Sequence, residues 1–246
     1  MVDGDGPLGL GYGVYEEFHH KMGNMSHTMH KQHLCTDFID ALGKRGELEK
    51  GIEVLDVGCG VGFHVLEMAK SFKHSRFAGV DIDANAIAHA TASAKHRHLS
   101  GSTTFIATDA AQLPEEWTNR FDLVLIFDAC HDQCRPDLSL QEIHRCLKPG
   151  GMLAMLEING TSNCFTDREK LGSAVSSWMY GVSLFHCLPL GSNCEGALGL
   201  GTMMGVERGK ELLELAGFHQ GDISVEHLPY FPLNVLYKAV KRAEEA

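Results

Sequence analysis

The stretch from Val54 to Gly62 constrains the fold more than any other part of this 246-residue chain. Branched apolar residues dominate the run from Ile52 to Val57, which predicts a strand buried on both faces. Three glycines at alternate positions then allow a tight turn and a close approach of the backbone to a ligand. The apolar spacing from Phe63 to Phe72 predicts a helix, whose N-terminal N–H groups and dipole favour a nucleoside or a carboxylate.

The nature of the ligand follows from the next strand. A second buried run, Phe77–Val80, ends at Asp81, where an acidic side chain can accept hydrogen bonds from two ribose hydroxyls. This pairing indicates a cofactor that contains adenosine. A dinucleotide fingerprint would continue with glycine or alanine three positions after the second glycine, and that position holds Phe63. The sequence therefore disfavours redox chemistry linked to NAD.

Five segments of the chain follow one another in the order and spacing of one enzyme family. They read VLDVGCGVG, FAGVDID, ATDAAQLP, FDLVLIFDACHD and LKPGGMLAMLEI. Together they resemble the successive motifs of the class I S-adenosylmethionine-dependent methyltransferases. The resemblance implies S-adenosyl-L-methionine as the cofactor. It also implies an α/β fold, a Rossmann-like, doubly wound, seven-stranded sheet that is mostly parallel and has an antiparallel C-terminal hairpin, in agreement with the alternation of strand and helix patterns.

Ligands of an open α/β sheet lie beyond the carboxyl ends of its strands, so we expect the cofactor there. In the resembled family an aspartate after the third strand contacts the adenine amino group. Here that residue is Asp109, although an aspartate in this position can also cap a turn. The candidate cofactor-binding residues are Asp56, Gly58, Cys59, Gly60, Asp81, Ile82, Asp109, Ala110 and Asp128, with Met25 and Ser26 at the edge of the N-terminal segment.

The end of the fourth expected strand supplies the best candidate base. His131 can accept a proton near neutral pH, and Asp132 or Glu157 can orient it. The local sequence also resembles plant-type small-molecule O-methyltransferases, in which the histidine of an HDW motif is the general base. Here Gln133 replaces the tryptophan, and we expect no N-terminal winged-helix domain because only about fifty residues precede Gly51. A buried structural histidine is the alternative interpretation.

Four cysteines flank the expected pocket, namely Cys130, Cys134, Cys187 and Cys194. Thiolates bind soft ions such as zinc or arsenite. No C-x-x-C pair is present, so we expect buried, inert thiols and no metal site.

Histidines recur in the N-terminal segment, at His19 and His20 and then at every third position in His27, His30 and His33. No carboxylate or cysteine lies at a compelling ligand spacing from them. We therefore expect a solvated helix face here rather than a metal site.

The pattern of apolar and polar residues divides the chain into two expected parts. Residues 1–50 are expected to form a helical lid over the cofactor, with a second helix that begins at Ser26 or His27 and ends at Leu42. Residues 51–246 are expected to form the methyltransferase domain, with an insertion at about 159–205 that builds the acceptor pocket.

The insertion contains a predicted helix, Asp167–Phe185, followed by a glycine-rich loop. Trp178 and His186 are candidate acceptor contacts, together with Asp132 and Glu157, although a tryptophan at helical spacing is more often a core residue.

Composition narrows the class of substrate. The net charge of −11 disfavours nucleic acid and anionic membranes as partners. No apolar run is long enough to span a bilayer and no secretory signal is recognisable, which predicts a cytoplasmic protein with reduced thiols. Oligomeric state cannot be predicted from these patterns.

The function predicted from the sequence is methyl transfer from S-adenosylmethionine to a hydroxyl or thiol of a small molecule, which loses its proton with help from His131. A thiol acceptor needs less help from a base. Two alternatives stay open: a thiol or metalloid S-methyltransferase that uses the pocket cysteines, and a non-catalytic regulatory module that binds the cofactor.

Overall fold

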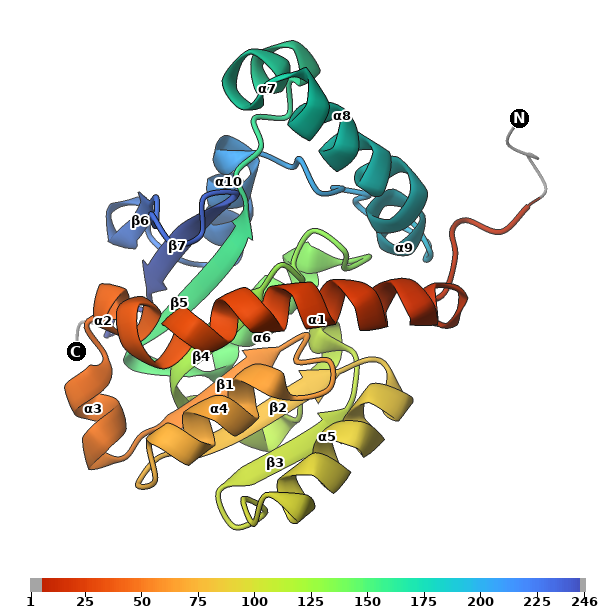
Figure 1. The fold of residues 1–246 in the computed structure, drawn as a ribbon. Coiled ribbons are helices and arrows are strands. Elements are labelled where there is room, and N and C mark those ends of the chain that lie inside the picture. Colours follow the sequence, from red (N-terminus) through yellow and green to blue (C-terminus); the bar gives the residue numbers. More distant parts are fainter. Residues whose placement is uncertain (1–5, 244–246) are drawn as a thin grey trace.

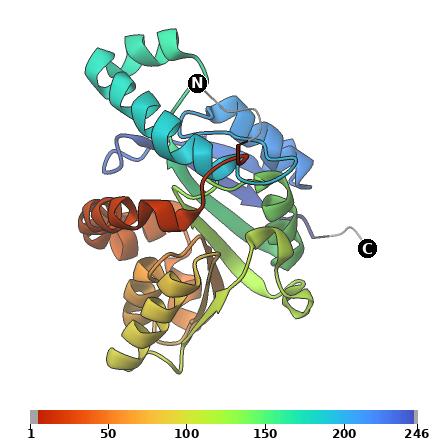
Figure 2. The ribbon, with the colours of Figure 1, turned by 90° about the vertical axis from the view of Figure 1, so that its right-hand side faces the viewer.

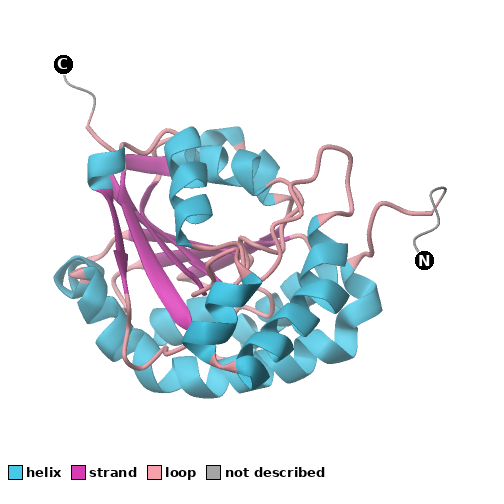
Figure 3. Ribbon diagram, turned by 90° about the horizontal axis from the view of Figure 1, so that it is seen from above, coloured by secondary structure: helices cyan, strands magenta, loops and turns pink. Residues whose placement is uncertain are grey.

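The computed structural model describes residues 6–243, which build one seven-stranded sheet with helices on both faces (Figure 1, Figure 3). The strand order is β3-β2-β1-β4-β5-β7-β6, and β7 lies antiparallel between β5 and β6. This confirms the predicted Rossmann-like, doubly wound, mostly parallel sheet with an antiparallel C-terminal hairpin. The strands are β1 (Glu53–Val57), β2 (Arg76–Asp81), β3 (Thr103–Ala107), β4 (Phe121–Phe127), β5 (Leu147–Ile158), β6 (Ile223–Glu226) and β7 (Asn234–Val240).

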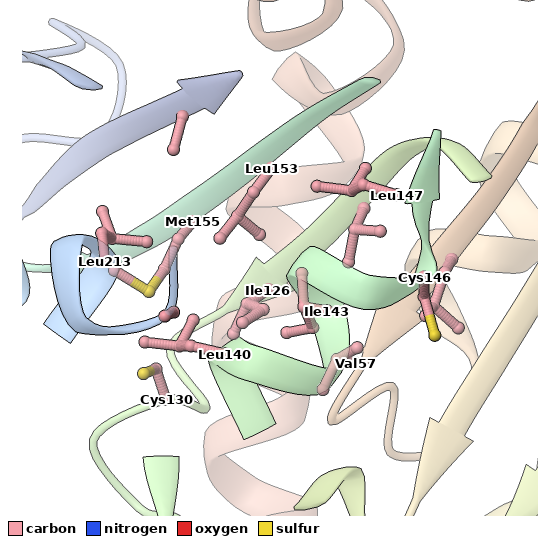
Figure 4. Close-up of a cluster of buried hydrophobic side chains, with 14 of the residues drawn as sticks. Val57, Ile126, Cys130, Leu140, Ile143, Cys146, Leu147, Leu153, Met155 and Leu213 are labelled. Carbon is pink, nitrogen blue, oxygen red and sulfur yellow. The ribbon is translucent and has the colours of Figure 1, made fainter. Parts of the chain in front are cut away.

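The central strands are apolar on both faces because two separate layers of helices cover them. Neighbouring residues of β1 divide between two core clusters, with Val54 in one and Leu55 and Val57 in the other. Figure 4 shows the second cluster, in which Val57 and Met155 of the sheet lie among side chains of the overlying helices. These buried strands therefore position the polar residues at their carboxyl ends.

The helices that flank the strands alternate with them along the chain. Helices α4 and α5 lie on one face of the sheet and α6 and α10 on the other (Figure 2). The Asp83 side chain caps α5 by accepting from the Asn85 N–H, as the sequence predicts. These helices are α4 (Phe63–Ser71), α5 (Ala84–His96), α6 (Pro136–Cys146) and α10 (Val206–Leu215), with 3₁₀ turns η3 (Ala110–Gln112), η4 (Glu115–Trp117) and η6 (Gln220–Asp222).

The N-terminal segment differs from the prediction. The structure has no break near Ser26: α1 runs continuously from Glu16 to His33 after the 3₁₀ turn η1 (Tyr12–Tyr15). A π-helical turn, η2 (Leu34–Phe38), then leads into α2 (Ile39–Leu42) and α3 (Arg45–Lys50). Helix α1 crosses the molecule between the segment α7–α9 and the pair α4 and α5 (Figure 1, Figure 2). It is thus placed to cover the edge of the sheet where the cofactor is expected.

The insertion after β5 also differs from the single helix expected over Asp167–Phe185. Gly172, with φ of 79° and ψ of 157°, separates α7 (Cys164–Leu171) from α8 (Ser173–Val182) because helical geometry cannot continue through this backbone conformation. A π-helical turn, η5 (Ser183–Cys187), and α9 (Leu188–Gly191) follow. Residues of η5 and α9 are buried, whereas α7 and the start of α8 project from the sheet (Figure 1).

Candidate functional site

The glycine-rich loop between β1 and α4 has one open side. Gly58 and Gly62 have φ of 73° and 77°, and a Cβ at these positions would lie 2.6 Å from Ala129 and 2.7 Å from Phe105. Gly60 has φ of 51°, but a Cβ there would have no heavy atom within 4 Å. Two glycines are therefore required by packing within the protein. The third leaves space against the backbone, as a bound nucleoside requires.

Asp81 at the end of β2 holds the loop in this shape. Its Oδ2 atom accepts a hydrogen bond of 2.7 Å from the Gly60 N–H, and Oδ1 accepts one of 2.9 Å from the Asp83 N–H. Burial raises the pKa of Asp81, and the two backbone donors partly offset this. Each oxygen keeps a lone pair for a further donor, such as a ribose hydroxyl. The neighbouring Ile82 is 55% exposed and offers an apolar surface beside this carboxylate.

Asp109 caps the turn that follows β3. Its Oδ1 atom accepts from the Ala111 N–H at 2.9 Å, which is the capping role that the sequence left open. The side chain is exposed, so its second oxygen faces the solvent side of the turn, and Ala110 beside it is half-buried. Capping fixes the direction of this carboxylate without using both of its oxygens.

Asp56 is buried in the middle of β1 and lacks a conventional partner. It is 1% exposed, and neither carboxylate oxygen has a hydrogen bond within the described part of the chain. The nearest titratable group is His64, whose Nδ1 atom lies 3.7 Å from Oδ2. Burial raises the pKa of Asp56 to about 8, and it also raises the pKa of the buried Cys59 thiol.

The loop, Asp81 and the unpartnered Asp56 fit the cofactor predicted from the sequence. An open backbone at Gly60 meets the adenosine, and Asp81 can receive the ribose hydroxyls. A buried carboxylate without a partner is costly unless a donor or a positive charge comes near it. Asp56 therefore has the chemistry to face the cationic end of S-adenosylmethionine through the glycine loop.

The strand β4 ends in a strained turn. Asp128 has φ of 47°, which is uncommon for a residue with a side chain, and its Oδ1 atom accepts from Asn234 Nδ2 at 2.6 Å. Burial and the nearby Glu157 raise the pKa of Asp128. This backbone conformation turns the chain sharply and brings His131 under the carboxyl end of β5.

His131 and Glu157 form a buried pair at this turn. The Nδ1 atom of His131 lies 2.5 Å from Oε2 of Glu157, and the Cys130 N–H donates to Oε1 at 2.8 Å. Burial opposes a charge on the imidazole, but the carboxylates of Glu157 and then Asp132 outweigh it and raise the pKa of His131 well above its ordinary value. Glu157, which is 0% exposed, thus orients the ring and leaves Nε2 for other contacts.

The surroundings of Nε2 come from the adjacent Asp132 and from the insertion. The Nε2 atom of His131 lies 3.4 Å from Oδ1 of Asp132, and Nδ1 of His186 lies 3.8 Å from Oδ2 of the same carboxylate. The Cys187 thiol lies 3.4 Å from His186 Nδ1 and 2.8 Å from the Thr202 hydroxyl. Burial raises the pKa of this thiol, while its hydrogen bond with His131 acts in the opposite direction. The structure therefore brings His131, Asp132, Glu157 and His186 together, and their catalytic and substrate-binding roles stay a prediction.

The sequence did not predict that residues of the 3₁₀ turn η1 and the start of α1 lie beside this cluster. Burial raises the pKa of the Tyr12 phenol, and the charges of Asp132 and Asp81 act in the same direction. Tyr15 and Phe18 contact the ring of His186, with centroid distances of 4.9 and 4.4 Å. The aromatic spacing of this segment was the available signal, but it does not reveal which residues a lid covers.

One other predicted residue does not join this cluster in the structure. Trp178 is 46% exposed on α8, away from the ring contacts just described. The side chains of Met25 and Ser26 lie outside the part of the chain that the structure describes, so their role stays a prediction.

The histidines of α1 are not the solvated face that we expected. His30 is 2% exposed, and His27 stacks on Phe63 with a centroid distance of 4.1 Å. His33 stacks on Tyr230 at 5.0 Å and lies 2.7 Å from Asp37. The prediction was wrong for these three because α1 packs against the domain along the side that carries them. The side chains of His19 and His20 lie outside the described part of the chain.

Comparison with known proteins identifies the class. The strand order and the loop are those of class I methyltransferases, and a family profile described as a methyltransferase domain matches residues 48–217. The chain belongs to this methyltransferase family, whose methyl donor is S-adenosylmethionine. Within residues 6–243 no helix has the length and apolarity needed to cross a membrane.

Two curated relatives each match less than half of the chain. A fatty-acid O-methyltransferase of Mycolicibacterium smegmatis is 34% identical over 102 residues, which are 42% of this chain and 35% of that protein. The ubiquinone/menaquinone biosynthesis C-methyltransferase UbiE of Allorhizobium ampelinum is 32% identical over 123 residues, 49% of this chain and 46% of that protein. The matches thus span less than half of either relative.

Solved structures share the fold at lower identity. The cyclase SpnF superimposes with a TM-score of 0.60 over 83% of this chain and 80% of its own, at 23% identity. This likeness supports the fold, and the site residues must carry any argument about chemistry.

Proposed function

We propose that the protein transfers the methyl group of S-adenosylmethionine to a hydroxyl or thiol of a small molecule. The observation that carries the proposal is the adjacency of two features. The open loop at Gly60 and the His131–Glu157 pair lie at the same edge of the sheet, on the neighbouring strands β1, β4 and β5. When bound, the cofactor supplies an electrophilic methyl group on a sulfonium sulfur.

The protein's own residues would have two tasks. The loop and Asp81 hold the adenosine, while Asp56 places a buried carboxyl group beneath the loop. The Nε2 side of His131 faces the acceptor and helps to remove its proton. Glu157 holds the imidazole ring in one orientation, as a carboxylate does for a catalytic histidine elsewhere.

The N-terminal segment and the insertion would enclose the acceptor. Leu10 donates its N–H to the Pro189 carbonyl at 2.9 Å, and the Tyr15 hydroxyl donates to the Phe185 carbonyl at 2.8 Å. These bonds join the first turn of the chain to η5 and α9 above the carboxyl edge of the sheet. We therefore propose residues 1–50 as a lid and residues 159–205 as the acceptor-pocket insertion.

The relatives leave the acceptor atom open. One is named as an O-methyltransferase and the other as a C-methyltransferase, so methylation of carbon is the second candidate. We favour a protic acceptor because His131 and its carboxylate partner match the removal of a proton from oxygen or sulfur.

The test combines binding and turnover. Calorimetry should show that S-adenosylmethionine and its demethylated product bind. A screen of phenols, small thiols, amines and carbon nucleophiles with methyl-labelled cofactor should then identify a substrate. Replacing His131→Ala should lower turnover by about a hundredfold or more while cofactor affinity stays unchanged. The exposed His89→Ala serves as a matched control. Binding without transfer to any acceptor would favour a regulatory module instead.

A further inference from the structure

Two pairs of adjacent residues from distant parts of the chain meet beneath the insertion. His131 and Asp132 follow β4, and His186 and Cys187 end the π-helical turn η5. One ligand atom each of His131, Asp132 and Cys187 lies within 4.8 Å of the other two. His131 and Cys187 are 4% and 2% exposed. An imidazole, a carboxylate and a thiol are thus collected in one place, with the Asp132 side chain still 16% exposed.

The Asp132 carboxylate lacks a hydrogen-bond partner that its burial would demand. Its Oδ1 atom is buried and makes no hydrogen bond within residues 6–243. It lies 3.4 Å from His131 Nε2, which is longer than an ordinary hydrogen bond. A cation bound by this oxygen and by the neighbouring ligand atoms would explain why the oxygen has no hydrogen-bond partner.

The histidine is already prepared as a ligand. Its Nδ1 atom is bonded to Glu157, so Nε2 is the nitrogen that faces Asp132 and Cys187. Histidines that bind metals almost always bond their other ring nitrogen to a carboxylate or a carbonyl, which fixes the ring and its tautomer. Glu157 is 0% exposed and also accepts the Cys130 N–H, so this supporting carboxylate is itself held in place.

The separation of His131 and Asp132 suits a small tetrahedral ion, and the Cys187 ligand atom lies within 4.8 Å of both. Bonds of about 2.0 to 2.3 Å from zinc to nitrogen, oxygen and sulfur imply ligand separations of roughly 3.3 to 3.8 Å. The His131–Asp132 separation is 3.4 Å. His186 is a neighbour of two of these ligands, since its Nδ1 atom lies 3.4 Å from Cys187 Sγ and 3.8 Å from Asp132 Oδ2.

We propose that His131, Asp132 and Cys187 bind one Zn²⁺ ion and leave its fourth position, beside His186, to the acceptor. Three protein ligands with an open position are the arrangement of a catalytic rather than a structural zinc site. Mixed imidazole, thiolate and carboxylate ligands favour zinc over magnesium or calcium. The metal site stands on these side chains alone, whereas the role of the ion toward the acceptor rests on the proposed function.

Coordination of the acceptor to zinc would explain how the acceptor loses its proton. A hydroxyl or thiol bound to zinc is more acidic, so its O–H or S–H bond breaks, the electron pair stays on oxygen or sulfur, and the proton leaves to solvent water. This refines the proposed function, because His131 would then promote proton loss as a ligand of the ion and its Nε2 atom would not take the proton directly. This differs from the expectation of inert thiols, which rested on the absence of a C-x-x-C pair.

The test measures metal binding directly. The full chain is stripped with a chelator, and Zn²⁺ or Co²⁺ alone is added. We expect one ion per chain, a sulfur-to-cobalt charge-transfer band and a raised melting temperature. Cys187→Ser should remove the band. Asp132→Asn should weaken zinc binding tenfold or more, and Glu157→Gln by about 10- to 100-fold through His131. Cys194→Ser, a half-buried thiol outside the three ligands, is the matched control.

The outcomes separate the two proposals. The zinc site is wrong if no ion binds, or if Cys187→Ser binds zinc as tightly as the native chain does. If Cys187→Ser fails to fold, zinc binding by Asp132→Asn decides between these outcomes. Methyl transfer by the stripped protein at the native rate would also overturn the role of the ion. Loss of S-adenosylmethionine binding in calorimetry contradicts the proposed function instead, and zinc binding does not depend on it.

Discussion

The Nδ1 atom of His30 on α1 lies 2.7 Å from the Nε2 atom of His64 on α4. In a hydrogen bond between two imidazoles one nitrogen donates and the other accepts, so the pair is suited to two neutral rings. His64 stacks on Phe127 with a centroid distance of 3.8 Å, and its other nitrogen is the one that lies near Asp56. The pair therefore connects the covering helix to the strand that precedes the glycine loop.

The first prediction concerns pH. Burial lowers the pKa of both His30 and His64 from 6.5 to about 3, and the neighbouring ring of His64 lowers the pKa of His30 further. Because the folded values are depressed, the unfolded chain binds more protons between about pH 6.5 and pH 3. Stability should thus be complete above about pH 6.5 and fall on acidification, by up to about 1.4 kcal/mol per pH unit for each histidine.

Melting temperatures of the native chain and of the double variant His30→Gln/His64→Gln, measured between about pH 7 and pH 5, check this prediction. The variant should lose less stability on acidification than the native chain. His89→Gln, at an exposed position of α5, should behave like the native chain. Equal slopes for the native chain and the double variant would show that the histidine pair does not set the acid sensitivity.

The second prediction concerns Asp81. Replacing Asp81→Ala removes the acceptor for the Gly60 N–H as well as the expected acceptor for the ribose. Hydrogen bonds to a charged group contribute about 1.5 to 3 kcal/mol, so affinity for S-adenosylmethionine should fall by roughly 10- to 100-fold. Calorimetry measures this change, with Asp222→Ala at the far edge of the sheet as the control. Unchanged affinity would remove Asp81 from the cofactor site.

A structural feature could be predicted from the sequence alone when neighbouring residues encode it. The buried strands and the glycine loop are encoded in short apolar runs and glycine spacing, and β1 and β2 lie at the two runs predicted as strands. The break at Gly172 was missed because a single glycine is also tolerated inside a helix. It becomes a break only through the positive φ that the tertiary structure imposes there.

The residues of the candidate site also divide into those that the sequence could predict and those that it could not. Asp81, His131 and Glu157 could be recognised because each follows or ends a predicted strand of a parallel sheet, and parallel strands bring their carboxyl ends together. The hydrogen bond between His30 and His64 could not be predicted, because helical periodicity does not specify which helix packs against which. Cys187 likewise meets His131 only after the insertion folds back over β4, and no spacing within the chain encodes that approach.

The third prediction separates two glycines of the loop. Gly58→Ala places a Cβ 2.6 Å from Ala129, whereas Gly60→Ala places one in open space, and both carry the cost of a positive φ. Gly60→Ala should therefore lose only about 1 to 2 kcal/mol of stability yet bind S-adenosylmethionine far more weakly. Gly58→Ala should lose more stability. Thermal unfolding and calorimetry check both, and native affinity in Gly60→Ala would mean that the cofactor does not approach this backbone.

The last prediction concerns the buried pair of His131 and Glu157. Removing one partner of a buried ion pair leaves an uncompensated charge and typically costs about 3 to 5 kcal/mol. Glu157→Ala should show a loss of this size, since it also deprives the Cys130 N–H of its acceptor. The double variant His131→Ala/Glu157→Ala should then be more stable than the sum of the single losses predicts, because neither charge remains. Denaturant unfolding of the native chain and the three variants measures the coupling. Additive losses would mean that the two side chains contribute independently, and that Glu157 does not hold His131 in the orientation on which the proposed chemistry depends.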